Sequence, residues 1–185
     1  LYTYVNLCEE LGEEAIYLVS DHSENGAFDF YYGQPNIFID ELRYMKYEIS
    51  LQIMDKYKVQ IHCRYENAWS LWSQVDITSI LPPEKLYENI VPSDRRSDDS
   101  FEQLKRRINT VIYHYKCNTE YKTFELDGRE YTNYENLVSR AIAAERGNAT
   151  VVTPKSEQSS SNSCSADLPD GFLSVDTKNV AVPFN

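Results

Sequence analysis

The chain has 185 residues, of which 42% are hydrophobic, and it carries a formal net charge of −11. This length provides apolar material for one sizeable core, but not comfortably for two. The acidic balance argues against a protein that coats nucleic acid through its overall field, although it leaves room for a local basic loop. No stretch approaches the roughly 20 apolar residues of a membrane span, and no signal peptide is recognisable.

The first third of the sequence alternates between helix and strand signals. Apolar residues recur at helical spacing over 1–11, and Gly12 follows as a favoured stop, so a helix is expected to open the chain. Short apolar runs predict strands at 15–19 and 36–39. The second run is continuously apolar, as in a strand buried on both faces of a sheet. Strands spaced around a helix suggest an α/β core.

The middle of the chain reads as a helix followed by a hairpin. Apolar positions within 47–57 fit a helix, and alternation over 59–63 fits a half-exposed strand. Residues 64–70 are expected to form the hairpin tip, with 71–79 as the returning strand. Pro82 and Pro83 then close that strand, because proline cannot donate to a sheet ladder.

The last third carries the strongest helix signal. Over 100–115 an apolar stripe follows a potential cap at Ser100, which predicts one long helix. Asp127-Gly128 predicts a hairpin turn between 121–126 and 129–131. A final helix is expected over 134–146, capped near Asn133, followed by a Ser-rich tail that cannot bury enough apolar surface to order itself. We therefore divide the chain into a core (1–115), a small hairpin-plus-helix appendage (116–147) and a disordered tail (148–185).

The sharpest chemical signal is the segment Ile37-Phe38-Ile39-Asp40-Glu41, an apolar strand that ends in two acids. Nucleotide hydrolases place one carboxylate near Mg²⁺ and another near the attacking water in this way. A buried strand would present both acids at its carboxyl end, where ligands of open α/β sheets bind. Taken alone, the same pattern also fits an ordinary exit of a strand into a polar loop.

Four stretches occur in an order that resembles a known family. Residues 33–43, 55–69, 75–87 and 103–111 together resemble the helicase domain of rolling-circle replication initiators of small DNA viruses and plasmids, which are superfamily 3 helicases of the AAA+ group. The matching motifs are Ile37-Phe38-Ile39-Asp40-Glu41-Leu42-Arg43, Met54-Asp55-Lys56-Tyr57, Arg64-Tyr65-Glu66-Asn67-Ala68-Trp69, Ile77-Thr78-Ser79-Ile80-Leu81-Pro82-Pro83-Glu84 and Arg106-Arg107-Ile108.

The resemblance implies a role for each matched position in ATP hydrolysis. Asp40 would hold Mg²⁺, and Glu41 would polarise the attacking water. Thr78 and Ser79 would sense the γ-phosphate. Arg107, with Arg106 as second choice, would reach the nucleotide of the neighbouring subunit in a homo-oligomeric ring.

The resemblance also implies a DNA-binding hairpin. Lys58 and Arg64 would meet phosphates, Asn67 would belong to the same contact set, and Trp69 would stack on bases. Arg106 and Arg107 could instead be a solvated helix face, and Trp69 could be an ordinary packing residue.

Two departures from the family bear on activity. Ile80 stands where the family usually has a sensor asparagine, and its side chain cannot hydrogen-bond a phosphate. No Gly-x-x-x-x-Gly-Lys-[Ser/Thr] loop occurs in the chain, although in the family this loop directly precedes a helix like 1–11. The resemblance implies an AAA+ P-loop NTPase-like parallel sheet flanked by helices. Because the phosphate-binding (Walker A) loop is missing, we expect this sheet to lack the Walker A strand and loop. Alone, the chain is expected neither to bind ATP tightly nor to hydrolyse it.

The resemblance implies that the intact protein unwinds DNA in an ATP-dependent reaction during plasmid or viral rolling-circle replication, and that it binds single-stranded or forked DNA. It would act in the bacterial cytoplasm or, if viral, in the host nucleus. An RNA helicase of a small RNA virus fits the same superfamily. A non-enzymatic α/β interaction module, with Asp40-Glu41 as an accidental strand exit, is the alternative from another class.

Overall fold

The computed structural model describes residues 2–20, 22, 26–117, 119–148 and 173–178. Its main sheet has six strands in the order β1-β2-β5-β8-β6-β7. Three of them run parallel to one another: β1 (Ile16–Val19), β2 (Asn36–Ile39) and β5 (Gln74–Ser79). The other three, β6 (Thr110–Cys117), β7 (Glu120–Asp127) and β8 (Leu173–Lys178), are joined by antiparallel pairing.

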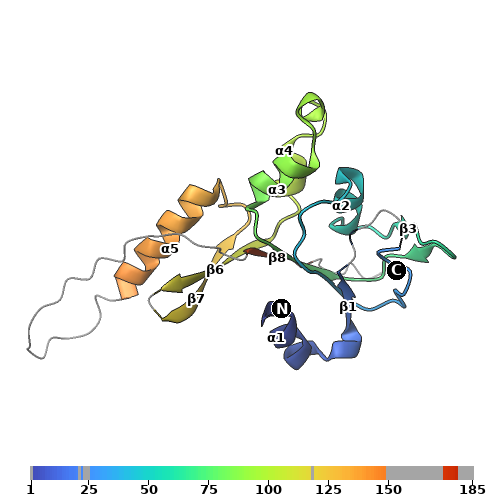
Figure 1. The fold of residues 1–185 in the computed structure, drawn as a ribbon, viewed down its shortest axis with the longest axis horizontal. Helices are drawn as coiled ribbons and strands as arrows, with labels where there is room; N and C mark the ends of the chain where they lie inside the picture. Colours follow the sequence, from blue (N-terminus) through green and yellow to red (C-terminus); the bar gives the residue numbers. More distant parts are fainter. Residues whose placement is uncertain (1, 21, 23–25, 118, 149–172, 179–185) are drawn as a thin grey trace, which may run out of the picture.

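Helices lie on both sides of the parallel strands. Figure 1 shows α2 (Tyr47–Ile53), α3 (Pro83–Ile90) and α4 (Phe101–Lys105) on one side, and α1 (Tyr2–Leu11) on the other. The fifth helix, α5 (Tyr134–Asn148), lies along the β6–β7 end. Short 3₁₀ turns occupy Glu13–Ala15 and Ser93–Arg95. In the part of the chain that the structure describes, no helix is long and apolar enough to cross a membrane.

The core fills the space between the sheet and α2–α5. Strand β2 is buried on both faces, as its continuous apolar run predicts, because Ile37 and Ile39 face the main core while the Phe38 ring lies 5.3 Å from the Tyr4 ring on α1. The predicted first helix and its stop are also confirmed. Gly12 adopts φ +86°, and its N–H donates to the Cys8 carbonyl.

The long helix predicted over 100–115 is wrong beyond Lys105. Residues 110–117 form strand β6, which pairs along its whole length with β7. The apolar spacing fits a helix, but the run Thr110-Val111-Ile112-Tyr113 is β-branched and aromatic, and such residues pack well on a pleated sheet. Val111 and Tyr113 alternate into the core from this strand.

The hairpin predicted at Asp127-Gly128 is also wrong. Residues 121–126 pair with β6 rather than with 129–131. Asp127 is the partner of Thr110, and the Gly128 N–H donates to the Asn109 carbonyl. A Cβ at Gly128 would come 2.0 Å from the Ile108 carbonyl oxygen, so glycine is needed here for a close backbone approach.

The returning strand predicted over 71–79 is confirmed only for residues 74–79, and it is not the strand that pairs with the predicted strand 59–63. A two-residue strand, β4 (Ala68–Trp69), pairs with β3 (Gln60–Ile61) in a separate small sheet. Strand β5 then leaves the hairpin and joins β2 in the main sheet. Between them Trp72 turns into the core, where its ring stacks on Phe28 and its Nε1 donates to the Ile53 carbonyl.

The segment from Tyr131 through α5 packs against the core. Tyr131 and Leu137 have no exposed surface. The Glu84 carboxylate in the first turn of α3 accepts hydrogen bonds from the Tyr131 hydroxyl and the Tyr134 backbone N–H. The predicted cap of α5 is confirmed, because Asn133 Oδ1 accepts from the Asn136 N–H at 2.9 Å.

The tail expected to be disordered contains one described element. Residues 173–178 form β8, which lies inside the main sheet between β5 and β6. The other residues of this prediction, apart from the end of α5, lie outside the part that the structure describes.

Candidate active site

The ends of β2 and β5 bring the two predicted acids next to the predicted sensor residues. Ile39 is the register partner of Ile77, and both strands run in the same direction. Asp40 and Thr78 therefore emerge together at the carboxyl edge of the sheet, where open α/β sheets bind ligands. The turn after β2 is fixed by the Leu42 N–H, which donates to the Thr78 carbonyl at 2.7 Å.

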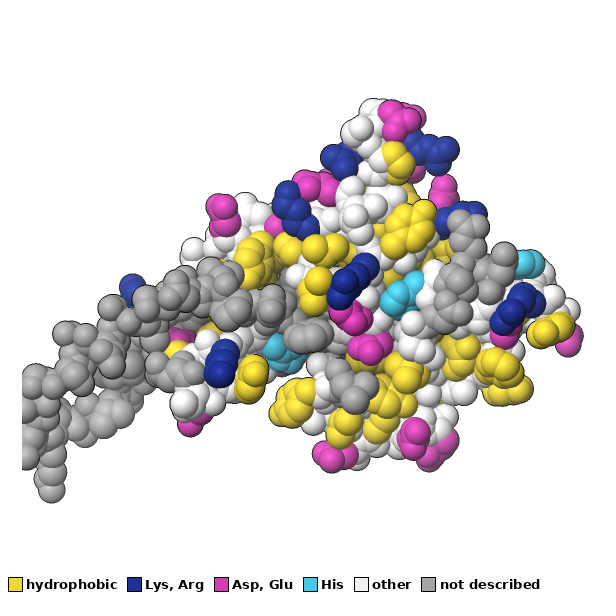
Figure 2. Space-filling model, in the orientation of Figure 1, with side chains coloured by type: hydrophobic (Ala, Val, Ile, Leu, Met, Phe, Trp, Pro, Cys, Tyr) yellow, Lys and Arg dark blue, Asp and Glu magenta, His cyan; other side chains and the backbone are white. Residues whose placement is uncertain are grey.

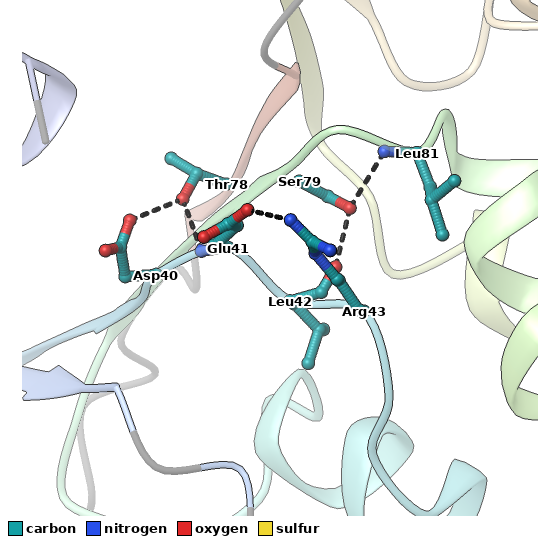
Figure 3. Close-up of polar contacts among 7 residues, drawn as sticks. All are labelled: Asp40, Glu41, Leu42, Arg43, Thr78, Ser79 and Leu81. Carbon is teal, nitrogen blue, oxygen red and sulfur yellow. Dashed lines mark hydrogen bonds and ion pairs between the residues drawn. The ribbon is translucent and has the colours of Figure 1, made fainter.

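The Thr78 hydroxyl links both acids, as Figure 3 shows. It donates to Asp40 Oδ1 at 3.0 Å and accepts from the Glu41 backbone N–H at 2.9 Å. Thr78 is 2% exposed, so this hydroxyl is satisfied largely inside the protein. Thr78 consequently fixes the orientation of the Asp40 carboxylate and the position of the Glu41 backbone.

Glu41 has an unusual backbone conformation. Its φ is +51°, and among the described residues no other non-glycine residue has a positive φ. For an ordinary L-residue this left-handed region costs on the order of 1 kcal/mol, and such strain is often found at functional sites. Its carboxylate forms an exposed ion pair with the Arg43 guanidinium, and an exposed pair of this kind stabilises a fold little.

The Ser79 hydroxyl forms its hydrogen bonds with backbone groups. Its hydroxyl donates to the Leu42 carbonyl at 2.6 Å and accepts from the Leu81 N–H at 3.1 Å, while the residue is 3% exposed. These bonds close the two loops that follow β2 and β5. The geometry therefore suits Ser79 to a structural role better than to the predicted contact with a phosphate.

The two candidate finger arginines differ in their surroundings. Arg107 donates to Asp55 Oδ2 at 2.9 Å and to the Gln103 carbonyl at 2.6 Å, and its side chain is 16% exposed. Arg106 is exposed, and no ion pair of its side chain is found in the described part of the chain. Arg107 thus ties α4 to the end of α2 within one molecule, and Arg106 is the more accessible cation.

The predicted DNA-binding residues gather on and around the β3–β4 hairpin. The Arg64 N–H and Nε donate to the two oxygens of Asp29, at 2.8 and 2.5 Å. The backbone hydrogen bond from Arg64 is the main cause that lowers the pKa of Asp29. Asn67 Oδ1 accepts from the Cys63 N–H at 3.4 Å, and Lys58 is exposed. Arg64 and Asn67 therefore shape the hairpin tip as well as lying on its surface.

Exposed aromatic rings accompany these polar groups, and Figure 2 shows hydrophobic side chains beside basic ones at the end of the molecule where β3 lies. Trp69 is 56% exposed, and two rings that the sequence reasoning did not single out are more exposed still: Tyr57 at 66% and Tyr65 at 89%. The sequence signal that could have identified Tyr57 and Tyr65 is their position next to basic residues in and before the hairpin. The Lys56 ammonium lies 5.1 Å from the centre of the Tyr57 ring. Large aromatic rings that remain exposed to water can stack on the bases of single strands.

A cavity of about 430 Å³ adjoins the carboxyl end of β5. Its lining includes Thr78, the first turn of α1 and the β6–β7 hairpin; the described lining residues are Tyr2, Thr3, Thr78, His114, Tyr121, Lys122 and Thr123. Burial lowers the pKa of His114, which favours the neutral imidazole. The cavity therefore brings hydroxyl, phenol and imidazole groups together with Thr78, which binds Asp40.

Comparison with models of known protein families and with curated proteins found no match. The structure by itself defines the class: a mixed α/β protein with a small sheet of three parallel strands flanked by helices, extended by antiparallel strands.

Proposed function

We propose that this chain is the helicase portion of a superfamily 3 replication initiator, which in its intact form couples ATP hydrolysis to the unwinding of DNA. The observation that carries this proposal is the Thr78 hydroxyl, which holds the Asp40 carboxylate and the Glu41 backbone at the carboxyl edge of two parallel strands. The ordered motifs of the sequence support it further.

Asp40 suits the role of a magnesium ligand. Mg²⁺ at phosphoryl-transfer sites takes one or two carboxylates, and phosphate oxygens and water complete its shell. Asp40 offers such a carboxylate, with one oxygen oriented by Thr78. A bound Mg²⁺ would supply neutralisation of charge on the transferred phosphoryl group.

Glu41 suits the polarisation of water. Its backbone is fixed by Thr78 and Leu42, whereas its carboxylate remains 47% exposed beside Arg43. A rigid backbone with an accessible carboxylate can accept a hydrogen bond from water in a defined direction. Arg43 must then release or share this carboxylate during turnover.

The proposed function requires a phosphate-binding loop, which the 185 residues do not contain. Such a loop lies between a strand and a helix, and α1 starts beside the cavity that Thr78 lines.

Arg106 replaces Arg107 as our preferred residue to reach a neighbouring subunit's nucleotide. The β3–β4 hairpin, with Arg64 and Trp69, would follow the single strand, which we propose to be DNA; RNA would fit the same surface chemistry.

The alternative is a non-enzymatic interaction module. The contacts of Thr78 and Ser79 also close the ends of β2 and β5, so they serve packing in any case. Under this alternative, removing the Asp40 charge would alter stability alone.

The deciding experiment uses a longer version of the protein that contains a phosphate-binding loop. Asp40→Asn should lower ATP turnover by about 100-fold or more, since it removes the charge opposite Mg²⁺, while the circular dichroism spectrum stays unchanged. Asp94→Asn, an exposed acid beyond α3, is the matched control and should keep full turnover. Unimpaired turnover of Asp40→Asn would reject the role assigned to Asp40.

A further inference from the structure

Residues 26–33, in the connection between β1 and β2, form a loop that packs against the β3–β4 hairpin, and we call it the flanking loop. The Cys63 thiol donates to the Phe28 carbonyl at 3.3 Å. The Arg64 backbone N–H donates to Asp29 Oδ1 at 2.8 Å. These bonds join the flanking loop to the hairpin segment between β3 and β4, at the end of the molecule where β3 lies (Figure 1).

The other end of the flanking loop contacts the segment that follows β4. The Leu71 N–H donates to the Tyr31 hydroxyl at 3.1 Å. A Cβ added at Gly33 would lie 3.3 Å from Leu71 Cδ1, so the Leu71 side chain packs directly against the Gly33 backbone. The flanking loop is therefore held at two places and follows a defined path beside the hairpin.

The flanking loop presents two aromatic rings to solvent. Phe30 is 69% exposed and Tyr32 is 84% exposed. Tyr31 between them turns inward, where its ring makes an edge contact with the buried Trp72 ring at 5.2 Å between centroids. This buried anchor fixes the backbone that carries the two outward rings. Exposed apolar side chains that lie close together commonly mark a binding surface.

The rings lie beside a basic segment of an acidic protein. Residues 56–72 contain two lysines and one arginine against a single acid, Glu66, whereas the whole chain has a net charge of −11. The Arg64 side chain is 55% exposed, although it pairs with Asp29. Surface cations attract a phosphate backbone, and every base has a face on which an aromatic ring can stack. Single-stranded nucleic acid therefore matches both properties of this surface.

We propose that the flanking loop is part of the surface that binds single-stranded DNA, with Phe30 and Tyr32 stacking on bases next to those that the hairpin binds. This inference rests on the proposed function, which assigns the hairpin to the strand. Neither residue belongs to the sequence stretches that resemble the helicase family. The binding surface then combines rings from two connections of the fold, because Tyr65 and Trp69 come from the hairpin.

Binding of a fluorescein-labelled oligothymidylate by the 185-residue chain tests this proposal. Phe30→Ala and Tyr32→Ala should each weaken binding at least about fivefold, because each removes one stacking ring. Tyr32→Phe keeps a ring and should bind like the parent. Tyr121→Ala is the matched control, because this ring is 82% exposed on β7 and β7 forms the opposite edge of the main sheet from β1.

The melting temperature shows that these variants remain folded. Each substituted side chain is largely exposed, so all four variants should melt within about 2 °C of the parent. If Phe30→Ala fails to fold, the comparison of Tyr32→Ala with Tyr32→Phe still decides on the proposal.

An abasic oligonucleotide of the same length separates stacking from charge. It keeps the phosphates but lacks the bases, so the parent, Phe30→Ala and Tyr32→Ala should bind it equally well. An equal loss of affinity for the abasic strand and for oligothymidylate would overturn the stacking role.

The outcomes separate this inference from the proposed function. If Trp69→Ala weakens binding while Phe30→Ala and Tyr32→Ala do not, the flanking loop is excluded and the role of the hairpin stands. If the parent binds no oligonucleotide, the role of the hairpin is rejected and this inference with it. Unchanged DNA binding, together with self-association that Tyr32→Ala abolishes, would assign the rings to a contact between two copies of the chain and overturn the proposal.

Discussion

Arg107 on the turn after α4 and Asp55 after α2 form an ion pair of 2.9 Å, although 52 positions separate them in the sequence. The pair holds the turn after α4 against the segment that follows α2. This geometry gives Arg107 a structural role within the single chain.

Replacing Arg107 should therefore destabilise the isolated chain. Arg107→Ala removes the ion pair and the bond to Gln103, which should cost about 1–3 kcal/mol of unfolding free energy. Arg106→Ala, at an exposed position, should change stability by less than about 0.5 kcal/mol. Urea unfolding followed by circular dichroism measures both. Equal stability of the two variants would show that the Arg107–Asp55 pair contributes nothing.

Thr78→Val should affect stability and turnover together. The substitution keeps the shape of the side chain but leaves the Glu41 N–H without its acceptor, which should cost about 1–3 kcal/mol. In the longer protein ATP turnover should fall by about tenfold or more. Thr78→Ser keeps the hydroxyl and should retain most of both. A Val variant that turns over ATP like the Ser variant would remove the positioning role of the hydroxyl.

Alkaline pH should weaken the fold through buried tyrosines. Burial is the main cause that raises the pKa of Tyr47 to about 12, and its hydroxyl donates to the Ser100 carbonyl. An unfolded tyrosine titrates near pH 10. The contribution to stability is therefore fully present below about pH 10 and is lost as the pH rises toward 12.

Tyr47→Phe should accordingly flatten the fall of unfolding free energy between pH 9 and 11. The fall does not vanish, because burial also raises the pKa of Tyr115 to about 12. Tyr44→Phe, at a position 55% exposed, is the control and should leave the slope unchanged. Urea titrations at several pH values provide the measurement, and an unaltered slope in Tyr47→Phe would contradict this assignment.

Gly128→Ala should disrupt the base of the β6–β7 hairpin. The added Cβ would meet the Ile108 carbonyl oxygen at 2.0 Å, and backbone atoms cannot yield as a flexible side chain can. We expect a loss of about 2–4 kcal/mol, seen as a lower melting temperature. A melting temperature within a degree of the parent would mean that the backbones do not approach this closely.

Substitutions of the two tryptophans should affect different properties, one the binding of nucleic acid and the other the stability of the fold. Trp69→Ala should weaken binding of a fluorescent single-stranded oligonucleotide by about 1–3 kcal/mol, with little change in stability, because the ring is 56% exposed. Trp72→Ala should cost about 3–5 kcal/mol of stability, because its ring is buried against Phe28. Unchanged oligonucleotide binding by Trp69→Ala would exclude this ring from the nucleic-acid surface.

Local signals in the sequence were sufficient for several elements. The helix ending at Gly12, the doubly buried strand 36–39 and the cap at Asn133 each depend on residues close in the chain. The adjacency of Asp40 and Thr78 could also be anticipated, since parallel strands end at the same edge of a sheet.

Long-range pairing explains what could not be predicted. Val111 and Ile112 fit a helical stripe and a strand equally well, and the ladder with β7 decides in favour of the strand. The Arg107–Asp55 pair and the use of Ser79 by the backbone depend on how distant loops meet. The position of β8 between β5 and β6 depends on the order of the whole sheet, which no local pattern contains.

The hydrogen bonds of the Glu84 carboxylate limit how far the protein can be truncated from its C-terminal side. It serves two hydrogen-bond donors at the start of the last helical segment, the Tyr131 hydroxyl and the Tyr134 N–H. A version that stops before Tyr131 would uncover the surface that Leu137 and Ala141 protect, and it should aggregate during expression.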